Sequence, residues 1–148
     1  MESSSTASLI STIDPPSLGP PNPVYAQITK VTLSETVTLL TIAGQVAVTP
    51  DGNTPETLGE QVDLCLSRLE TCLAAADANV HDMTRFMYYL TEKAYEHDGA
   101  LSLVVEKVTP WLEGHRPASC FLVVKSLSKA KFMCEFEAQA VVRTAIPG

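Results

Sequence analysis

The sequence has few basic residues and no long hydrophobic run, and we expect no signal peptide. No apolar stretch is long enough to cross a bilayer, and no basic segment precedes an apolar core, so we expect no membrane partner. The 10 Lys and Arg residues are scattered and outnumbered by 17 Asp and Glu, which gives a net charge of −7 at pH 7. Phosphate recognition needs clustered basic side chains, so the composition argues against nucleic acid as a partner but leaves room for a single basic pocket.

Metal-binding and redox motifs are also missing. The three histidines have neither HxH nor HExxH spacing: His81, His97 and His115. We therefore predict no metal site. The four cysteines have no CxxC spacing and fall on expected core faces: Cys65, Cys72, Cys120 and Cys134. This pattern favours buried, reduced thiols in a cytoplasmic protein, with a disulfide or a reactive thiol as the alternative.

At 148 residues, with 45% hydrophobic and 18% charged residues, the chain has the size and composition of one globular domain. Residues 1–22 are rich in Ser and Pro and lead into LGPPNP, where prolines beside a glycine disfavour regular structure. We expect residues 1–22 to be a flexible or extended segment, with a weak targeting extension as the alternative. Residues 23–148 are the expected folded domain.

Strand-type residues follow this segment. The stretch from Val24 to Val31 and the stretch TVTLLTIAG after the polar Ser34-Glu35 pair are typical of an antiparallel hairpin. Gly44 ends the second apolar run. A glycine there indicates either a bulge or a close approach of the backbone to a ligand.

The most regular pattern is a helix that follows the turn sequence TPDGNTPE. Thr54 is the expected N-cap and Pro55 the first helical residue. Apolar residues then recur at spacings of three and four and define one buried stripe: Leu58, Val62, Cys65, Leu69, Cys72 and Ala76. Asn79 is the expected left-handed cap at the end of this helix.

The second half of the chain predicts a strand, a helix and two further strands. Residues 83–91, MTRFMYYLT, are rich in aromatic and β-branched residues, which is typical of a strand. A helix is expected from Ala94 to Leu112, with Pro110 kinking or shortening its last turn. Residues 115–142 then contain two strands joined by a polar turn.

The expected order is β-β-α-β-α-β-β, an α+β domain with a single mixed sheet and both helices on one face. Apolar residues occupy both alternations of FLVVKSL, residues 121–127, so both faces of that strand should be covered. Since the helices cover one face, a partner subunit is the expected cover of the other.

Two glutamates interrupt the apolar last strand. Glu135 and Glu137 are two residues apart, so their side chains should share one face. A carboxylate in a buried strand needs a partner or a chemical role, and burial raises its pKa toward that of a general acid or base. Residues of other strands could complete a polar cluster around Glu135: Arg116, Tyr25 or Ser119. The alternative, above all for Glu137, is that these glutamates lie on a solvent-exposed face and form salt bridges there.

These residues fall in a series of motifs that resembles the RidA (YjgF) family of reactive-intermediate deaminases. In order, the motifs are NPVYAQ (22–27), IAGQVAV (42–48), MTRFMYYL (83–90), RPASC (116–120) and CEFEAQAVV (134–142). The resemblance implies a chorismate-mutase-like fold and a homotrimer whose sheets face inward, with a small-molecule pocket at each subunit interface. It also implies hydrolysis of enamines and imines to 2-keto acids and ammonia, without a cofactor.

By the same resemblance, Glu135 positions the attacking water and serves as the acid or base. Tyr25 and Ser119 are the other implied catalytic residues. The implied substrate-binding residues are Arg116, Ala118, Cys120, Gly44 and Phe121.

Ala118 departs from the family pattern. The deaminases have an arginine immediately before the serine at this point, which clamps the substrate carboxylate. Arg116 lies two residues upstream, about 6–7 Å away on the same side of an extended strand, so it could partly reach the site. Pro117, however, fixes the backbone between them. Loss of a bidentate arginine favours a bulkier or uncharged substrate.

Three functions are compatible with these observations. The preferred one is a trimeric enzyme of a specialised pathway that acts on an imine, enamine or related intermediate by hydrolysis, proton transfer or cyclisation. The second is a conventional 2-iminobutanoate or 2-iminopropanoate deaminase in which Arg116 replaces the missing arginine. The third is a non-catalytic trimer that binds a small ligand or a partner protein, or acts as a chaperone.

Overall fold

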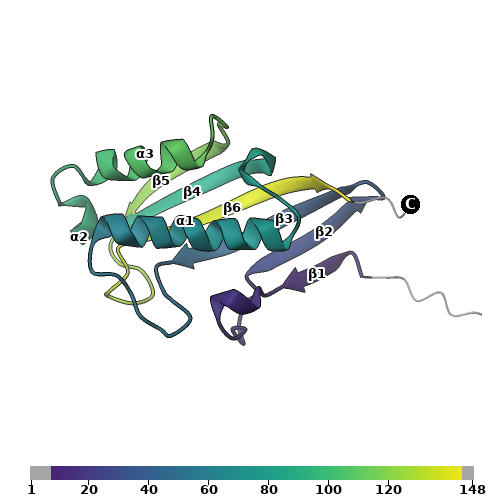
Figure 1. Cartoon of the computed structure of the whole chain (residues 1–148), viewed down its shortest axis with the longest axis horizontal. Helices are drawn as coiled ribbons and strands as arrows, with labels where there is room; N and C mark the ends of the chain where they lie inside the picture. The colour runs from purple at the N-terminus through teal and green to yellow at the C-terminus, as the bar shows by residue number, and fades with distance from the viewer. Residues whose placement is uncertain (1–7, 145–148) are drawn as a thin grey trace, which may run out of the picture.

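The computed structural model describes residues 8–144, which form a six-stranded mixed sheet with helices on one of its faces (Figure 1). The strands are β1 (Ile10–Ile13), β2 (Ile28–Ser34), β3 (Val37–Val46), β4 (Met83–Thr91), β5 (Ala118–Val124) and β6 (Cys134–Arg143). The helices are η1 (Pro16–Leu18), α1 (Leu58–Ala75), η2 (Val80–Asp82), α2 (Glu92–Tyr95) and α3 (Ala100–Trp111). The predicted α+β class, with one mixed sheet and its helices on one face, is confirmed.

The strand order is β1-β2-β3-β6-β4-β5. Four neighbouring pairs are antiparallel, and β4 and β5 run parallel. β6 therefore enters between β3 and β4, and β5 forms the edge beyond β4. The last two strands, β5 and β6, are consecutive in the chain but are not paired, because β4 lies between them.

The N-terminal segment contributes to the same sheet. Within residues 8–22, β1 pairs with β2 from Ile10 to Ile13, and η1 follows it. The proline-rich stretch after η1 is irregular up to the start of β2, as its sequence predicts. The extended edge strand β1 thus precedes the seven elements expected from the sequence.

Helix α1 starts later and ends earlier than predicted. Its N-cap is Thr57, not Thr54, because Thr57 and Glu60 form a capping pair in which the Thr57 side chain accepts a hydrogen bond from the Glu60 amide. The helix ends at Ala75, and the left-handed residue that follows is Asp77, with φ 56°. Asn79 is extended and instead caps η2. The predicted apolar stripe is fully buried, as expected.

The helix expected from Ala94 to Leu112 is divided in two. Thr91 caps the short helix α2, and Gly99, in the left-handed conformation with φ 77°, separates it from α3. Pro110 lies within the last turn of α3, which ends one residue later at Trp111. The left-handed glycine, rather than the proline, is therefore the main interruption.

Alternate residues of the central strands face the helices and form the core. The largest buried core side chains on β3, β4 and β6 are Leu40, Ile42, Phe86, Leu90 and Phe136. Figure 1 shows α1 and α3 over this face. The opposite face, which we call the open face, carries Thr41, Arg85, Glu135, Glu137 and Gln139, and no element of residues 8–144 covers it. Among the described residues, no helix is both long and apolar enough to span a membrane.

Candidate functional site

Glu135 lies against the backbone of β3 at one end of the open face. In the sheet it is the partner of Val46 on one side and of Tyr89 on the other. The β3–β6 register shifts between Ile42 and Gln45, next to Gly44. A Cβ atom added to Gly44 would overlap Oε1 of Glu135 and lie 2.8 Å from its Cδ. Gly44 thus marks both a register shift and a close approach, and the group that approaches is the Glu135 carboxyl.

The environment of Glu135 favours its protonated form. Burial raises the pKa of Glu135 above its ordinary value, and the nearby charge of Glu137 raises it further. The Glu137 carboxylate, in contrast, has a hydrogen-bond donor, since the Tyr89 hydroxyl donates a hydrogen bond of 2.9 Å to its Oε1. Among residues 8–144, no side chain donates a hydrogen bond to Glu135. The Glu135 carboxyl therefore favours its protonated form, and without a side-chain donor it is free to bind water or a substrate.

Ala118 begins β5, and Arg85 of β4 is its direct partner in the parallel register. Gln139 of β6 is in turn the partner of Arg85, so these three residues form one row across the sheet. Arg85 and Glu137 line a cavity of about 220 Å³ on the open face. Within the described part of the chain, the Arg85 guanidinium lies in no ion pair. An arginine therefore lies beside Ala118, on the neighbouring strand.

Glu135 and Ala118 cannot act on one small substrate within a single chain. Glu135 is level with Tyr89 of β4, and Ala118 is level with Arg85, four residues away along the strand. With about 3.3 Å per residue along a strand and about 4.8 Å between strands, their Cα atoms are about 16 Å apart. The two ends of the candidate site could meet only if a second copy of the chain covered the open face.

Ser119 and Phe121 face the helices rather than the open face. Both line a mostly apolar cavity of about 280 Å³ between β5 and α3, together with Tyr88. The polar cluster of Ser119 with Glu135 that the sequence suggested therefore does not form within the chain, because strand alternation directs the two side chains to opposite faces. Cys120 is exposed, and its partner Met87 is level with Glu137 on the open face.

Tyr25 and Arg116 lie outside regular strands. Tyr25 is 49% exposed in the segment before β2. Arg116 is exposed in the loop before β5. Neither of them forms a hydrogen bond with Glu135 in the part of the chain that the structure describes.

The cysteines divide into three buried thiols and one exposed thiol. Cys65, Cys72 and Cys134 are buried and free, whereas Cys120 is exposed, contrary to the expectation of a buried residue. Cys120 belongs to an edge strand, which no further strand covers. The Sγ atoms of Cys65 and Cys134 are 3.8 Å apart, and this contact, together with burial, raises the pKa of Cys65 well above its ordinary value.

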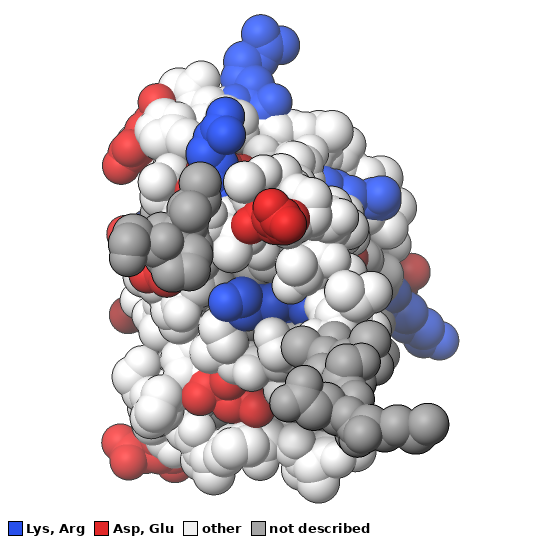
Figure 2. All heavy atoms as spheres, turned by 90° about the vertical axis from the view of Figure 1, so that its right-hand side faces the viewer, with Lys and Arg blue, Asp and Glu red and all other residues white. Residues whose placement is uncertain are grey.

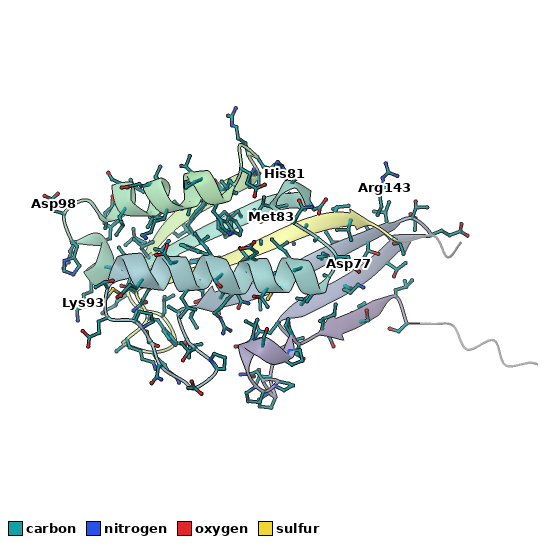
Figure 3. The ribbon with its side chains drawn as sticks, in the orientation of Figure 1. Asp77, His81, Met83, Lys93, Asp98 and Arg143 are labelled. Atoms are coloured by element: carbon teal, nitrogen blue, oxygen red, sulfur yellow. The ribbon has the colours of Figure 1, made fainter. Side chains whose placement is uncertain are left out.

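Two of the three histidines, His81 and His115, have side-chain contacts that explain them structurally. His81 lies 3.2 Å from Glu113, and His115 Nε2 lies 2.7 Å from the carbonyl oxygen of Met83. Figure 3 labels His81 and Met83 at the end of β4 that is remote from α2. Within residues 8–144, no group of three His, Cys, Asp or Glu side chains is arranged to hold a metal ion.

Arg85 is the candidate residue that inspection of the sequence missed. The alternation of side chains in the strand MTRFMYYLT indicates that Arg85, Met87 and Tyr89 share one face. This much could have been inferred from the local sequence. What the sequence does not reveal is that β5 lies parallel to β4, with Ala118 opposite Arg85.

Comparisons with known proteins agree with this fold. A family model described as Endoribonuclease L-PSP matches residues 23–142. The chain is similar to the solved structure of the Rid-family protein YyfA from Yersinia pestis, with a TM-score of 0.76, 20% identity, and coverage of 90% of this chain and 99% of that one. No protein of curated function matches the chain by sequence.

Two structures from Escherichia coli are also similar. The yjgF gene product has a TM-score of 0.68 and 23% identity, with coverage of 88% of this chain and 98% of that one. TdcF, solved with bound serine, has a TM-score of 0.69 and 23% identity, with coverage of 90% of this chain and 100% of that one. At these identities the structural likeness concerns the fold.

Proposed function

Because the chain belongs to the Endoribonuclease L-PSP family, to which the YjgF and Rid proteins are related, we propose that it is an enzyme that hydrolyses imines or enamines. The observation that carries this proposal is the Glu135 carboxyl, which lies against Gly44 on the open face with a raised pKa and no hydrogen-bond donor among the side chains of residues 8–144. Such a group is suited to take a proton from water and to return it to a leaving nitrogen.

In the proposed reaction Glu135 carries two protons in turn from water to the nitrogen. Glu135 accepts a proton from a water molecule as the water oxygen bonds to the imine carbon and the C=N π electrons move to nitrogen, and it returns this proton to the nitrogen, which gives a carbinolamine. Glu135 then takes the proton of the carbinolamine hydroxyl and delivers it to the same nitrogen, so that the C–N bond breaks, the oxygen becomes the carbonyl oxygen and ammonia leaves. An enamine would first take a proton at carbon to become the imine. No metal or cofactor takes part in these steps.

The complete site requires more than one copy of the chain. Glu135 and the start of β5 are about 16 Å apart within one chain by strand geometry, and the open face between them is uncovered in residues 8–144. A homotrimer in which the open faces meet would bring Glu135 of one copy toward the Ala118 end of the next. The exposed apolar side chains Leu122 and Val141 would be buried by the same contact.

Arg85 is the proposed carboxylate-binding residue. It lies beside Ala118, lines the open-face cavity and has no ion-pair partner in the described residues, so its planar guanidinium is available for a carboxylate. Arg116 is a weaker candidate because it is exposed in a loop before β5. With Arg85 in this role, a 2-imino acid would be an acceptable substrate despite Ala118.

Ammonia release tests the proposal. The substrate would be 2-aminocrotonate formed in situ by a dehydratase, and the wild-type protein should release ammonia faster than the uncatalysed background. Glu135→Gln should lower this rate by about 10²-fold or more, as expected for the loss of a general acid or base. If Glu135→Gln leaves the rate unchanged, the proposed mechanism is wrong. If the wild-type protein releases no ammonia above background, imine hydrolysis of this substrate is refuted.

A second candidate is a proton transfer or cyclisation on a bulkier, uncharged substrate of a specialised pathway. The small exposed side chains of Ala118 and Cys120, which leave space at the start of β5, favour it. Arg85→Ala separates the two candidates. It should raise the KM for an imino acid strongly, and it should leave turnover of an uncharged substrate nearly unchanged.

A further inference from the structure

A second cavity lies at the end of the sheet where β4 is followed by α2. It has a volume of about 440 Å³ and is lined by the start of α2, by the loop from Lys125 to Met133 and by the segment that leads into α1. None of the residues assigned above to imine chemistry lines it. Its function, if any, is therefore separate from that of the open face.

Positive charge is concentrated in this cavity. Four of the six lysines of the chain line it: Lys93, Lys125, Lys129 and Lys131. Glu56 is the one acidic residue in its lining, and within residues 8–144 no carboxylate oxygen lies within 4.0 Å of any of these ammonium groups. The sequence suggested scattered basic residues. The fold instead gathers most of the lysines of a chain with a net charge of −7 around one cavity.

The charge distribution differs at the other end of the molecule. Figure 2 shows that end, and basic and acidic side chains are interspersed there. Figure 3 labels Lys93 at the opposite end, near the start of α2. The positive charge is thus local rather than a continuous track, which suits a small anion better than a long nucleic acid.

The floor of the cavity is held by buried contacts. Gln61 of α1 is 1% exposed, and its amide donates hydrogen bonds of 2.9 Å to the carbonyls of Pro55 and Lys131. The Gln61 side-chain oxygen accepts a hydrogen bond from the Met133 amide, also at 2.9 Å. These bonds join both walls of the cavity to α1, so the cavity is largely formed before a ligand arrives.

Two further features suit a ligand with both polar and apolar parts. Thr54 lines the cavity with a buried hydroxyl that has no hydrogen-bond partner among residues 8–144. The buried ring of Phe132 lies beneath the Lys131 ammonium, which is 5.7 Å from the ring centroid. An unpaired hydroxyl in a lysine-lined pocket can donate to a ligand oxygen.

We propose that this cavity binds a small organic phosphate with at least two negative charges. Its volume lies in the range of small-molecule pockets, about 300–1,000 Å³. Lysines act as mobile point charges, which suits the three oxygens of a terminal phosphate group. Apolar side chains of the lining, Leu127 and Met133, accommodate a short organic part. The site is distinct from the imine site, so its ligand is either a regulator or a second substrate.

Isothermal titration with pyrophosphate and with phenyl phosphate tests this inference on the full-length protein. We expect saturable binding, weakened by salt, with phenyl phosphate retaining affinity through its ring. Lys125→Gln and Lys129→Gln should each weaken binding by about fivefold, the effect of one ion pair near water. Glu56→Gln should tighten it. Lys30→Gln, a lysine outside the cavity, is the matched control and should bind like the wild type.

Three results would overturn the inference. The first is the absence of saturable binding of both probes at millimolar concentration. The second is an equal loss of affinity in Lys30→Gln, which would indicate a general charge effect. The third is much tighter binding of a single-stranded RNA than of phenyl phosphate, with a steep salt dependence, which would assign the lysines to nucleic acid. Since Lys125 and Lys129 are exposed and Lys30 is only partly buried, circular dichroism should report an unchanged fold in every variant.

Discussion

Replacing Gly44 by alanine should abolish most of the activity of the proposed site while leaving the fold intact. The φ of Gly44 lies outside the left-handed region, so alanine can adopt its backbone conformation. The added Cβ would overlap Oε1 of Glu135 and lie 2.8 Å from Cδ and 3.0 Å from Cγ, so the carboxyl must rotate away. A displacement of about 1 Å at a reacting group costs about 10²-fold in rate. Alanine in place of glycine within a strand stabilises the fold by about 0.5–1 kcal/mol.

The assay measures ammonia release for the rate and urea unfolding for the stability. Gly59→Ala is the matched control. Gly59 lies on α1, away from the open face, and its added Cβ would meet only the flexible end of the Lys107 side chain, at 3.2 Å. We expect the control to keep the wild-type rate. A fully active Gly44→Ala variant would refute the role of Glu135. A variant that is inactive because it no longer folds would refute the claim that Gly44 acts through the Glu135 carboxyl.

Three further predictions concern titration, thiols and the core. The raised pKa of Glu135 means that the folded state favours its protonated form, so the stability that this preference contributes is present below about pH 4.5 and is lost at higher pH. Glu135→Gln should therefore raise the urea midpoint near neutral pH, and this gain should disappear in acid. A thiol reagent should leave the buried Cys65, Cys72 and Cys134 unmodified in the folded protein and should modify all four cysteines after denaturation, as counted by absorbance. Leu69→Ala should cost about 2–5 kcal/mol in urea unfolding because Leu69 is fully buried, whereas the exposed Leu101→Ala should cost far less.

Local sequence patterns correctly predicted those helices and strands that have one dominant signal. The apolar stripe of α1 is buried at every predicted position, and β4 coincides with MTRFMYYLT. Where two local signals compete, the sequence alone does not decide. Thr54 before Pro55 and Thr57 before Glu60 are both acceptable helix starts, and the capping pair at Thr57 prevails.

Pairings between distant segments could not be predicted from patterns. The alternation of β6 placed Glu135 and Glu137 on one face, but the insertion of β6 between β3 and β4 depends on contacts across almost 100 residues of chain. The same holds for Arg85, whose position beside Ala118 requires β5 to run parallel to β4. The side of the sheet that Ser119 faces also depends on the register of β5, which a short apolar edge strand does not specify.

A mixing experiment tests the central claim, that Glu135 of one copy and Arg85 of another form one site. Glu135→Gln and Arg85→Ala chains would be unfolded, mixed in equal amounts and refolded together, and ammonia release would be compared with that of each variant alone. In a cyclic homotrimer, about one quarter of the interfaces would combine an intact Glu135 with an intact Arg85. The account predicts recovery of about a quarter of the wild-type rate. A mixture no more active than its two components would contradict it.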